Sequence, residues 1–283
     1  MKKIVTCLAT ALVAVLASLA VAAPATAAPT SGINDWTCRP SAAHPEPVVL
    51  WHGLGSSGDV GMLLLSQHLK SQGYCVYYKT YGTTHWGPFI GGLASMRESA
   101  VELDEFVEKV RASTGAKKVS IAGHSEGTTV PAYYLKFLGG DKVVKHFVGF
   151  GSNFKGSTLG GLQQLADLLG FRPILDAGGC TSCNEFAPNS EFMKDLNEGG
   201  VSVPGPSYTS IVTKYDEVVT PYTSGILAPA SNVNNVVLQD VCAVDLSGHL
   251  GLAWDPNVFA LVTNALDPAN AKPVGCVPMP WLS

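Results

Sequence analysis

Residues 117–138, KKVSIAGHSEGTTVPAYYLKFL, contain the transition that decides the fold: an apolar strand enters a tight turn and leaves it as a helix. Val119 to Ala122 predict a short buried strand. Gly123-His124-Ser125-Glu126-Gly127 has the Gly-x-Ser-x-Gly pattern of a nucleophile elbow, a strained turn that lifts a serine hydroxyl above a sheet. A side chain at either glycine would crowd neighbouring backbone in so sharp a bend. The pattern therefore predicts Ser125 as a nucleophile.

The helix after Ser125 is predicted to aim its free N–H groups at the reaction centre. Pro131 is expected within the first turn or so, where a missing N–H is tolerated, and Gly139-Gly140 is expected to end the helix. The pentapeptide alone is weak evidence, because a serine among small residues recurs by chance. The strand before it, the helix after it and suitable partners downstream favour a catalytic serine over a serine in an ordinary glycine-rich turn.

The N-terminus has the pattern of a signal peptide. Lys2 and Lys3 precede an apolar stretch from Ile4 to Ala23, and Pro24-Ala25-Thr26-Ala27 is a small-residue cleavage pattern. We expect residues 1–27 to be removed, the protein to be secreted, and no stable membrane insertion afterwards. An uncleaved anchor is the alternative because the apolar run is long, but its alanine-rich character favours cleavage.

The remaining residues 28–283, about 256 of them, suit a single α/β domain. The signal carries two of the 18 basic residues and none of the 22 acidic ones, so the mature chain has 16 basic and 22 acidic residues and a net charge of −6. This charge, with no basic run, argues against a nucleic-acid partner. We expect a monomer.

Six cysteines remain after the signal, an even set that predicts disulfides in an exported protein. Fifteen pairings are possible for six cysteines. Sequence order suggests three local loops, formed by Cys38 with Cys75, Cys180 with Cys183 and Cys242 with Cys276. Cys180-Thr-Ser-Cys183 could also be half of a metal site or a redox pair, but no second Cys/His pair at zinc spacing accompanies it.

Val48 to Trp51 form a continuous apolar run, which predicts a central buried strand that empties into His52-Gly53-Leu54-Gly55. Such a glycine-rich loop lets a backbone N–H approach a substrate oxygen. We expect the oxyanion donors to be the N–H groups of Leu54 and of Glu126, the residue after the nucleophile. A simple strand-to-helix turn is the alternative.

The remaining predicted elements alternate between helices and strands. Met96, Ala100, Leu103, Val107 and Val110 follow one helical face, closed by Gly115. Further predictions are helices at 59–69 and 255–266, strands at 74–78, 146–150, 208–212 and 234–239, and a loop at 80–92. This order favours a mostly parallel sheet with helices on both faces.

Residues 152–206 interrupt the alternation. They are rich in Gly and Ser, and Leu159, Leu162, Leu165 and Leu169 have near-helical spacing. A helix inserted between the strands that carry the nucleophile and the acid would cover the active site as a lid or acyl-binding wall. Ordinary core packing of these leucines is an equally good interpretation.

Acyl transfer by serine needs a base near the hydroxyl and a carboxylate that orients the base. His249, in Ser247-Gly248-His249, is the one histidine in a late loop beyond the last predicted strand, so we expect it to be the base. Asp216 follows a strand by a few residues and is the expected acid. The rivals are less favourable: Asp240 and Asp245 lie on the same connection as His249, and Glu217 is expected to point to solvent.

These stretches together resemble the secreted class 2 lipases and related carboxylesterases of the α/β-hydrolase superfamily. The matching segments are VVLWHGLG from Val48, VSIAGHSEG from Val119, YYLKFLGG from Tyr133, YDEVV from Tyr215 and SGHLGL from Ser247. The resemblance implies an α/β-hydrolase fold and hydrolysis of carboxylic esters, acylglycerols among them, without a cofactor. It implies a catalytic triad of Ser125, Asp216 and His249, with oxyanion donors at Leu54 and Glu126.

Two residues depart from the family pattern. Glu126 puts a carboxyl group beside an oxyanion donor, and Thr128 stands where a third glycine is common. No ligand cluster supports a calcium site or another metal site. The substrate is expected to be a lipid or another ester, met in solution or at a lipid–water interface. An acyltransferase with the same triad, a polyester-cleaving esterase and a non-catalytic binding module are the alternatives.

Overall fold

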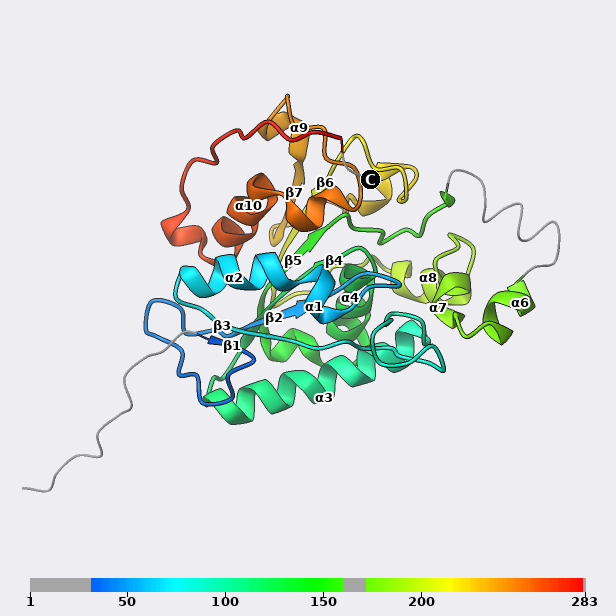
Figure 1. The fold of residues 1–283 in the computed structure, drawn as a ribbon, viewed down its shortest axis with the longest axis horizontal. Helices are drawn as coiled ribbons and strands as arrows, with labels where there is room; N and C mark the ends of the chain where they lie inside the picture. The colour runs from blue at the N-terminus through cyan, green and yellow to red at the C-terminus, as the bar shows by residue number, and fades with distance from the viewer. Residues whose placement is uncertain (1–31, 160–171, 282–283) are drawn as a thin grey trace, which may run out of the picture.

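A sheet of seven parallel strands forms the centre of the computed structural model, which describes residues 32–159 and 172–281 (Figure 1). The order across the sheet is β1-β3-β2-β4-β5-β6-β7. The strands are β1 (Gly32–Ile33), β2 (Val48–Trp51), β3 (Cys75–Tyr78), β4 (Val119–His124), β5 (Val144–Phe150), β6 (Ser207–Val212) and β7 (Val233–Val237). Parallel strands bring all their carboxyl ends to one edge, and β4, with the nucleophile elbow, lies at the middle of the sheet.

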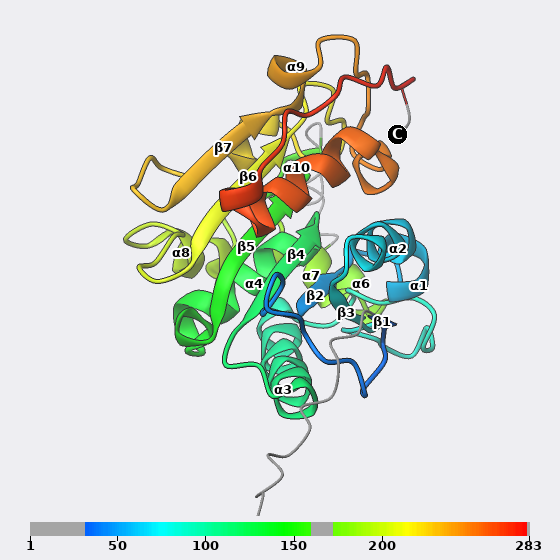
Figure 2. The ribbon, with the colours of Figure 1, turned by 90° about the vertical axis from the view of Figure 1, so that its left-hand side faces the viewer.

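The strands are apolar on both faces because helices cover both faces. Val49 and Trp51 of β2 pack toward α3 (Met96–Thr114) and α4 (Glu126–Phe137). Val48 and Leu50 belong to the opposite core, with α2 (Leu63–Ser71) and α10 (Pro256–Leu266). Figure 2 shows the two helical layers on either side of the sheet. The predicted α/β-hydrolase architecture is therefore present.

Helices α3 and α10 begin and end at capping residues that are recognisable in the sequence. Ser95 caps α3 by accepting a hydrogen bond from the N–H of Arg97, and Gly115 ends the helix with φ 73°. Asp255 caps α10 by accepting from the N–H of Asn257, with Pro256 as the first helical residue.

Other boundaries differ from the prediction. The helix expected over 59–69 is two helices, α1 (Gly58–Gly61) and α2, which are separated at Met62, where φ −117° and ψ −5° depart from helical values. The last strand stops at Val237, and α9 (Leu238–Val241) turns the Gln239 side chain back to the N–H of Lys214. The two-residue strand β1 was not predicted.

Pro131 is the sixth residue of α4, in the interior of the helix and not in its first turn. A proline there cannot donate to the carbonyl of Gly127, four residues earlier. That carbonyl instead packs onto the α-carbon of Gly123. The helix therefore lacks an N–H at Pro131, and the Gly127 carbonyl that would have accepted from it lies against Gly123 of strand β4 instead.

Between β5 and β6, the residues that the structure describes form the short helices α6 (Arg172–Ala177), α7 (Thr181–Glu185) and α8 (Glu191–Asn197). Leu162, Leu165 and Leu169, which predicted a helix in this segment, lie outside the described residues. The lid and the domain boundaries remain predictions.

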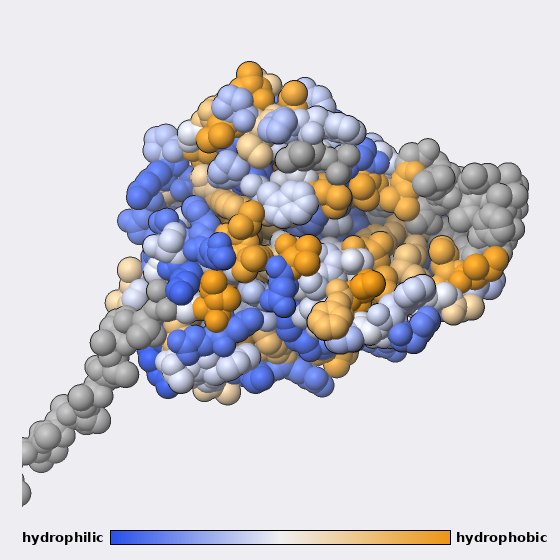
Figure 3. Space-filling model, viewed as in Figure 1, coloured by the Kyte–Doolittle hydropathy of each residue, from blue (hydrophilic) through white to orange (hydrophobic). Residues whose placement is uncertain are grey.

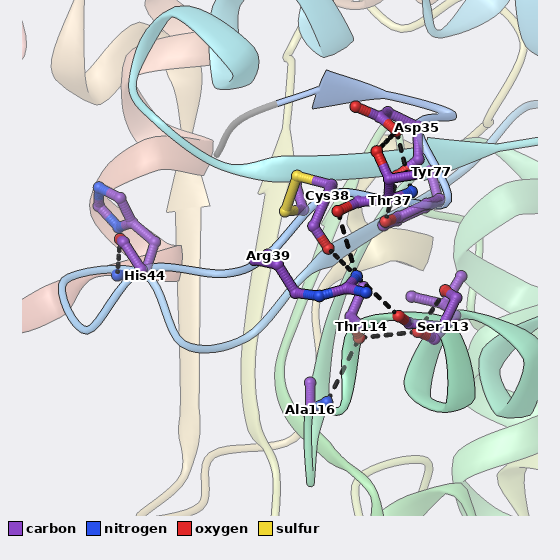
Figure 4. Close-up of a disulfide and its surroundings, with 12 residues drawn as sticks. Asp35, Thr37, Cys38, Arg39, His44, Tyr77, Ser113, Thr114 and Ala116 are labelled. Carbon is purple, nitrogen blue, oxygen red and sulfur yellow. Dashed lines mark hydrogen bonds between the residues drawn. A yellow bond between two sulfur atoms is a disulfide. The ribbon is translucent and has the colours of Figure 1, made fainter. Parts of the chain in front are cut away.

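The three disulfides suggested by sequence order are present: Cys38–Cys75, Cys180–Cys183 and Cys242–Cys276. The first ties the segment before β2 to strand β3. Figure 4 shows the neighbouring Arg39 guanidinium donating to the carbonyls of Cys38 and Ser113, which adds a link to the end of α3.

Candidate active site

Ser125 occupies the turn between β4 and α4 with a backbone that few residues other than glycine adopt, at φ 56° and ψ −121°. Both flanking glycines are required sterically. A Cβ at Gly123 would overlap the carbonyl of Gly127, and a Cβ at Gly127 would overlap the carbonyl of Trp51. This arrangement is the strained strand-to-helix turn that the sequence predicts.

The structure brings Ser125, His249 and Asp216 into one hydrogen-bonded chain. Nε2 of His249 lies 2.8 Å from Oγ of Ser125, and Nδ1 of the same ring lies 2.9 Å from Oδ2 of Asp216. All three side chains are almost completely buried. The distances are those of a serine, a base that can take its proton and an acid that orients the base.

The second oxygen of Asp216 is fixed by the backbone of its own loop. Oδ1 accepts hydrogen bonds from the N–H groups of Val218 and Val219, at 3.1 and 2.6 Å, so Oδ2 is directed to His249. The rival acids have other roles: Asp240 forms an exposed ion pair with Lys214, and Asp245 binds the side chain of Asn257.

The loop that carries His249 is held by two neighbours. Nε2–H of His124 donates to the carbonyl of His249 at 2.9 Å, and Glu217 accepts from the N–H of His249 at 3.1 Å. Glu217 is exposed, as expected, and its carboxyl group additionally accepts this hydrogen bond. Burial, followed by the proximity of His249, lowers the pKa of His124 to about 3, so His124 is a neutral donor.

Two backbone N–H groups lie at the elbow with no hydrogen-bond partner in residues 32–159 and 172–281. They belong to Leu54, after β2, and to Glu126, the first residue of α4. The Leu54 loop is fixed by hydrogen bonds from the N–H of Gly55 to Gly91 and from the N–H of Gly91 to Ser56. Fixed, unpartnered donors beside a nucleophile can stabilise a developing oxyanion without reorganising.

A cavity of about 560 Å³ opens beside Ser125. Its walls are mainly apolar: the side chains of Leu159, Leu175, Phe186, Val218 and Val219 are buried or half-buried, whereas those of Leu54, Val60, Leu250 and Trp254 are exposed, as expected at a mouth. Figure 3 shows apolar surface gathered on the side of the molecule where α6 and α7 lie. A cavity of this size and lining suits an apolar acyl chain or alcohol.

Within the described part of the chain, no group of three or more His, Cys, Asp or Glu side chains could hold a metal ion. The same residues include no helix that is long and apolar enough to cross a membrane.

Sequence reasoning missed three contributors. The first is His124, which supports the backbone of His249. The second is Asn153, a buried residue of the cavity wall that accepts a hydrogen bond from the hydroxyl of Thr129. The third is the buried side chain of Glu126. His124 and Glu126 had a signal, since both lie inside the Gly-x-Ser-x-Gly motif, although the burial of the Glu126 side chain did not; the position of Asn153 depends on long-range packing.

Comparisons with known proteins identify the family and the fold. Residues 45–250 match the family described as Lipase (class 2). The structure is similar to that of Aspergillus fumigatus lipase B, with a TM-score of 0.65 at 20% identity over 84% of this chain and 57% of that chain. The chain thus spans little more than half of that protein.

For two further solved structures, the matched region covers nearly the whole length of the other chain. The product of gene lin2722 of Listeria innocua has a TM-score of 0.52 at 17% identity, over 84% of this chain and 98% of that chain. A structure from a study of Nitrososphaera gargenis carboxylesterases has a TM-score of 0.51 at 15% identity, over 79% and 90%. At these identities the likeness shows the fold alone.

Proposed function

The chain belongs to the class 2 lipase family, and we propose that it is a secreted serine ester hydrolase, a lipase or carboxylesterase that cleaves carboxylic esters through an acyl-enzyme on Ser125. The observation that carries the proposal is the hydrogen-bonded chain from Ser125 through His249 to Asp216, beside two unpartnered N–H groups. The family membership and the fold support the same class of reaction.

Acylation begins when Nε2 of His249 takes the proton of the Ser125 hydroxyl as Oγ attacks the ester carbonyl carbon. The carbonyl oxygen becomes negative and receives hydrogen bonds from the N–H groups of Leu54 and Glu126. The bond to the leaving alcohol then breaks, and the alcohol oxygen takes the proton from His249. Asp216 keeps Nδ1 protonated and stabilises the imidazolium that forms between these two transfers.

Deacylation repeats these steps with water. His249 takes a proton from a water molecule that attacks the acyl carbon, the same two N–H groups bind the oxyanion, and the proton returns to Oγ of Ser125 as the acid leaves. His249 becomes positively charged only transiently, and every residue has its starting charge again at the end of the cycle. No cofactor enters the proposed chemistry.

The cavity supports uncharged, apolar esters as substrates, acylglycerols among them. Its mouth exposes large apolar side chains: Val60 is 65% exposed, Leu250 47% and Trp254 42%. Such a rim suits contact with a lipid–water interface. The three disulfides support an oxidising, extracellular location.

The test is Ser125→Ala, assayed with a soluble short-chain ester and with a triacylglycerol emulsion. We expect turnover and labelling by a fluorophosphonate to be lost while the circular dichroism spectrum and the melting temperature are retained. Ester hydrolysis that survives the substitution contradicts the proposal. Product analysis with added alcohol separates hydrolysis from acyl transfer, because a transferase would give the new ester as the main product.

A further inference from the structure

Glu126 carries a carboxyl group that the mechanism above does not use. It is 0% exposed, and neither Oε1 nor Oε2 has a hydrogen-bond partner within residues 32–159 and 172–281. Glutamate is almost never fully buried unless it is paired, because an unpaired buried charge is very costly. The carboxyl therefore needs either a partner or a proton.

The carboxyl lies against the loop that carries the other oxyanion donor. A Cβ added at Gly92 would lie 2.9 Å from Oε2 of Glu126 and 3.1 Å from the α-carbon of Leu54. The absence of a side chain at Gly92, where φ is 71°, makes room for the glutamate. The side chain that follows the nucleophile thus reaches across to the backbone that follows β2.

The titratable groups that face Glu126 are the hydroxyl of Tyr81, in the loop after β3, and the carboxyl of Glu185, on α7. Neither is a cation. Glu185 accepts hydrogen bonds from Ser95 Oγ and from the N–H of Met96 at the start of α3. Burial first, and the charge of Glu185 second, hold the pKa of Glu126 well above its usual value.

The hydroxyl proton of Tyr81 is already used in a hydrogen bond. Its hydroxyl is fully buried and donates to the carbonyl of His52 at 2.9 Å. The Tyr81 oxygen can therefore only accept a further hydrogen bond, and a carboxylate has none to offer. A carboxylic acid has one, so a proton on Glu126 would give its carboxyl group a partner and the Tyr81 oxygen a donor. Burial raises the pKa of Tyr81 well above its usual value, so the tyrosine keeps its own proton.

We propose that Glu126 is a positioning residue, held as a neutral carboxylic acid that donates to Tyr81 and so joins the elbow to the His52–Gly55 loop. The chain of hydrogen bonds runs from Glu126 through Tyr81 to the carbonyl of His52, two residues before Leu54. Each of its ends belongs to a segment that supplies one of the two oxyanion N–H groups. The inference rests on the proposed function, since it assigns a purpose to the spacing of those two groups.

The test compares Glu126→Gln, which keeps a side-chain donor without a titratable proton, with Glu126→Met, which keeps the volume without a donor. We expect the Met variant to be at least as stable as the wild type, because it removes a buried acid. Its kcat for a soluble ester should nevertheless be about tenfold below that of the Gln variant, the equivalent of one ordinary intramolecular hydrogen bond. Asp240→Asn, a surface substitution, is the control for basal activity.

Tyr81→Phe tests the connection itself. We expect it to lower kcat to a similar extent, and the double variant Glu126→Met with Tyr81→Phe to be no worse than either single variant, because all three break the same chain. A Met variant as active as the Gln variant, or fully additive losses in the double variant, overturns the proposal.

Infrared difference spectra test the proton independently of activity. The wild type minus Glu126→Gln should show the C=O stretch of a protonated carboxyl at pH 7, and Asp255→Asn should leave that band in place. Absence of the band overturns the neutral acid even if esters are hydrolysed. If Ser125→Ala leaves hydrolysis unchanged, the proposed function fails. The infrared band still tests the proton on Glu126 independently of that result.

Discussion

The contacts of Asp216 distinguish it from the other acidic residues near His249. Its two oxygens are divided between the backbone N–H groups of Val218 and Val219 and the ring of His249. Asp240 lies on the surface with Lys214 as its partner. Sequence order alone placed the acid correctly beside the imidazole, but it could not show the backbone amides that fix its orientation.

Asp216→Asn should lower kcat by about 10³- to 10⁴-fold, because an amide in place of the carboxylate favours the wrong tautomer of His249. Stability should change little, since the amide keeps the shape of the side chain. The measurement is kcat and KM for a soluble ester. Asp240→Asn is the matched control and should retain wild-type kinetics; an Asp216→Asn variant with equal kcat would mean that another group orients the base.

Gly123→Ala should prevent the native elbow from forming, because the added methyl group overlaps the carbonyl of Gly127. The cost exceeds what a flexible neighbour could absorb, since both groups belong to backbone. Gly275→Ala, where a Cβ meets nothing within 4 Å, is the control and should stay within about 0.5 kcal/mol of the wild type. Thermal unfolding of both variants decides the matter; a Gly123→Ala protein that melts like the control contradicts it.

At the level of elements, the connection from β7 to α10 is organised by two buried carboxyl groups, Asp245 and Asp255. Asp245 accepts from the N–H of Ser247, and Asp255 accepts from the Ser247 hydroxyl and caps α10. Burial, and then the hydrogen bond and charge of Asp245, raise the pKa of Asp255 to about 7. The loop that presents His249 is thus closed by two neighbouring buried acids, of which Asp255 keeps its proton up to about pH 7.

This pair makes stability depend on pH. The folded protein keeps the proton of Asp255 up to about pH 7, whereas the unfolded chain releases it near 3.8. Its contribution to the free energy of unfolding is therefore full below about pH 4 and is lost as the pH rises from 4 to 7, by an amount on the order of a few kcal/mol.

Asp255→Asn should abolish that loss, because asparagine caps a helix as well as aspartate and does not titrate. Urea unfolding at several pH values between 4 and 7 measures it, as the difference between variant and wild type. Asp240→Asn should retain the wild-type dependence on pH. Parallel curves for wild type and Asp255→Asn would show that Asp255 is ionised throughout this range.

At the scale of the whole molecule, the disulfides constrain the unfolded chain to different extents. Cys38–Cys75 spans 37 residues, whereas Cys180–Cys183 spans 3. Loop-closure entropy predicts stabilisation of about 4 kcal/mol from the first and about 2 kcal/mol from the second.

Paired Cys→Ser substitutions test this order. Removal of Cys38–Cys75 should lower the unfolding free energy more than removal of Cys180–Cys183, and urea unfolding at one pH measures both. A larger loss at Cys180–Cys183 would mean that this disulfide acts mainly on the folded state, where Cys183 lines the cavity.

The sequence predicted the parallel sheet and the convergence of Ser125, Asp216 and His249 because each depends on local signals arranged in chain order. The strands are apolar runs in the sequence, and a capped helix such as α3 begins after Ser95 and ends before Gly115. Features set by distant contacts were not predictable: Gln239 leaves the strand pattern to bind the N–H of Lys214, and the exposed Glu217 accepts from the N–H of His249. The fate of Glu126 depends on Gly92 and Tyr81, which no local pattern connects to it.

The parallel sheet also decides how the protein could be fixed to a support. Since the mouth of the cavity opens at one edge of the strands, the opposite edge is free for attachment, and Lys117, Lys142 and Lys145 are exposed there, before β4 and around the start of β5. A support joined to the protein at these three lysines would hold it by the edge of the sheet opposite the cavity mouth; because other lysines, such as Lys155 and Lys214, are exposed too, those would first have to be replaced.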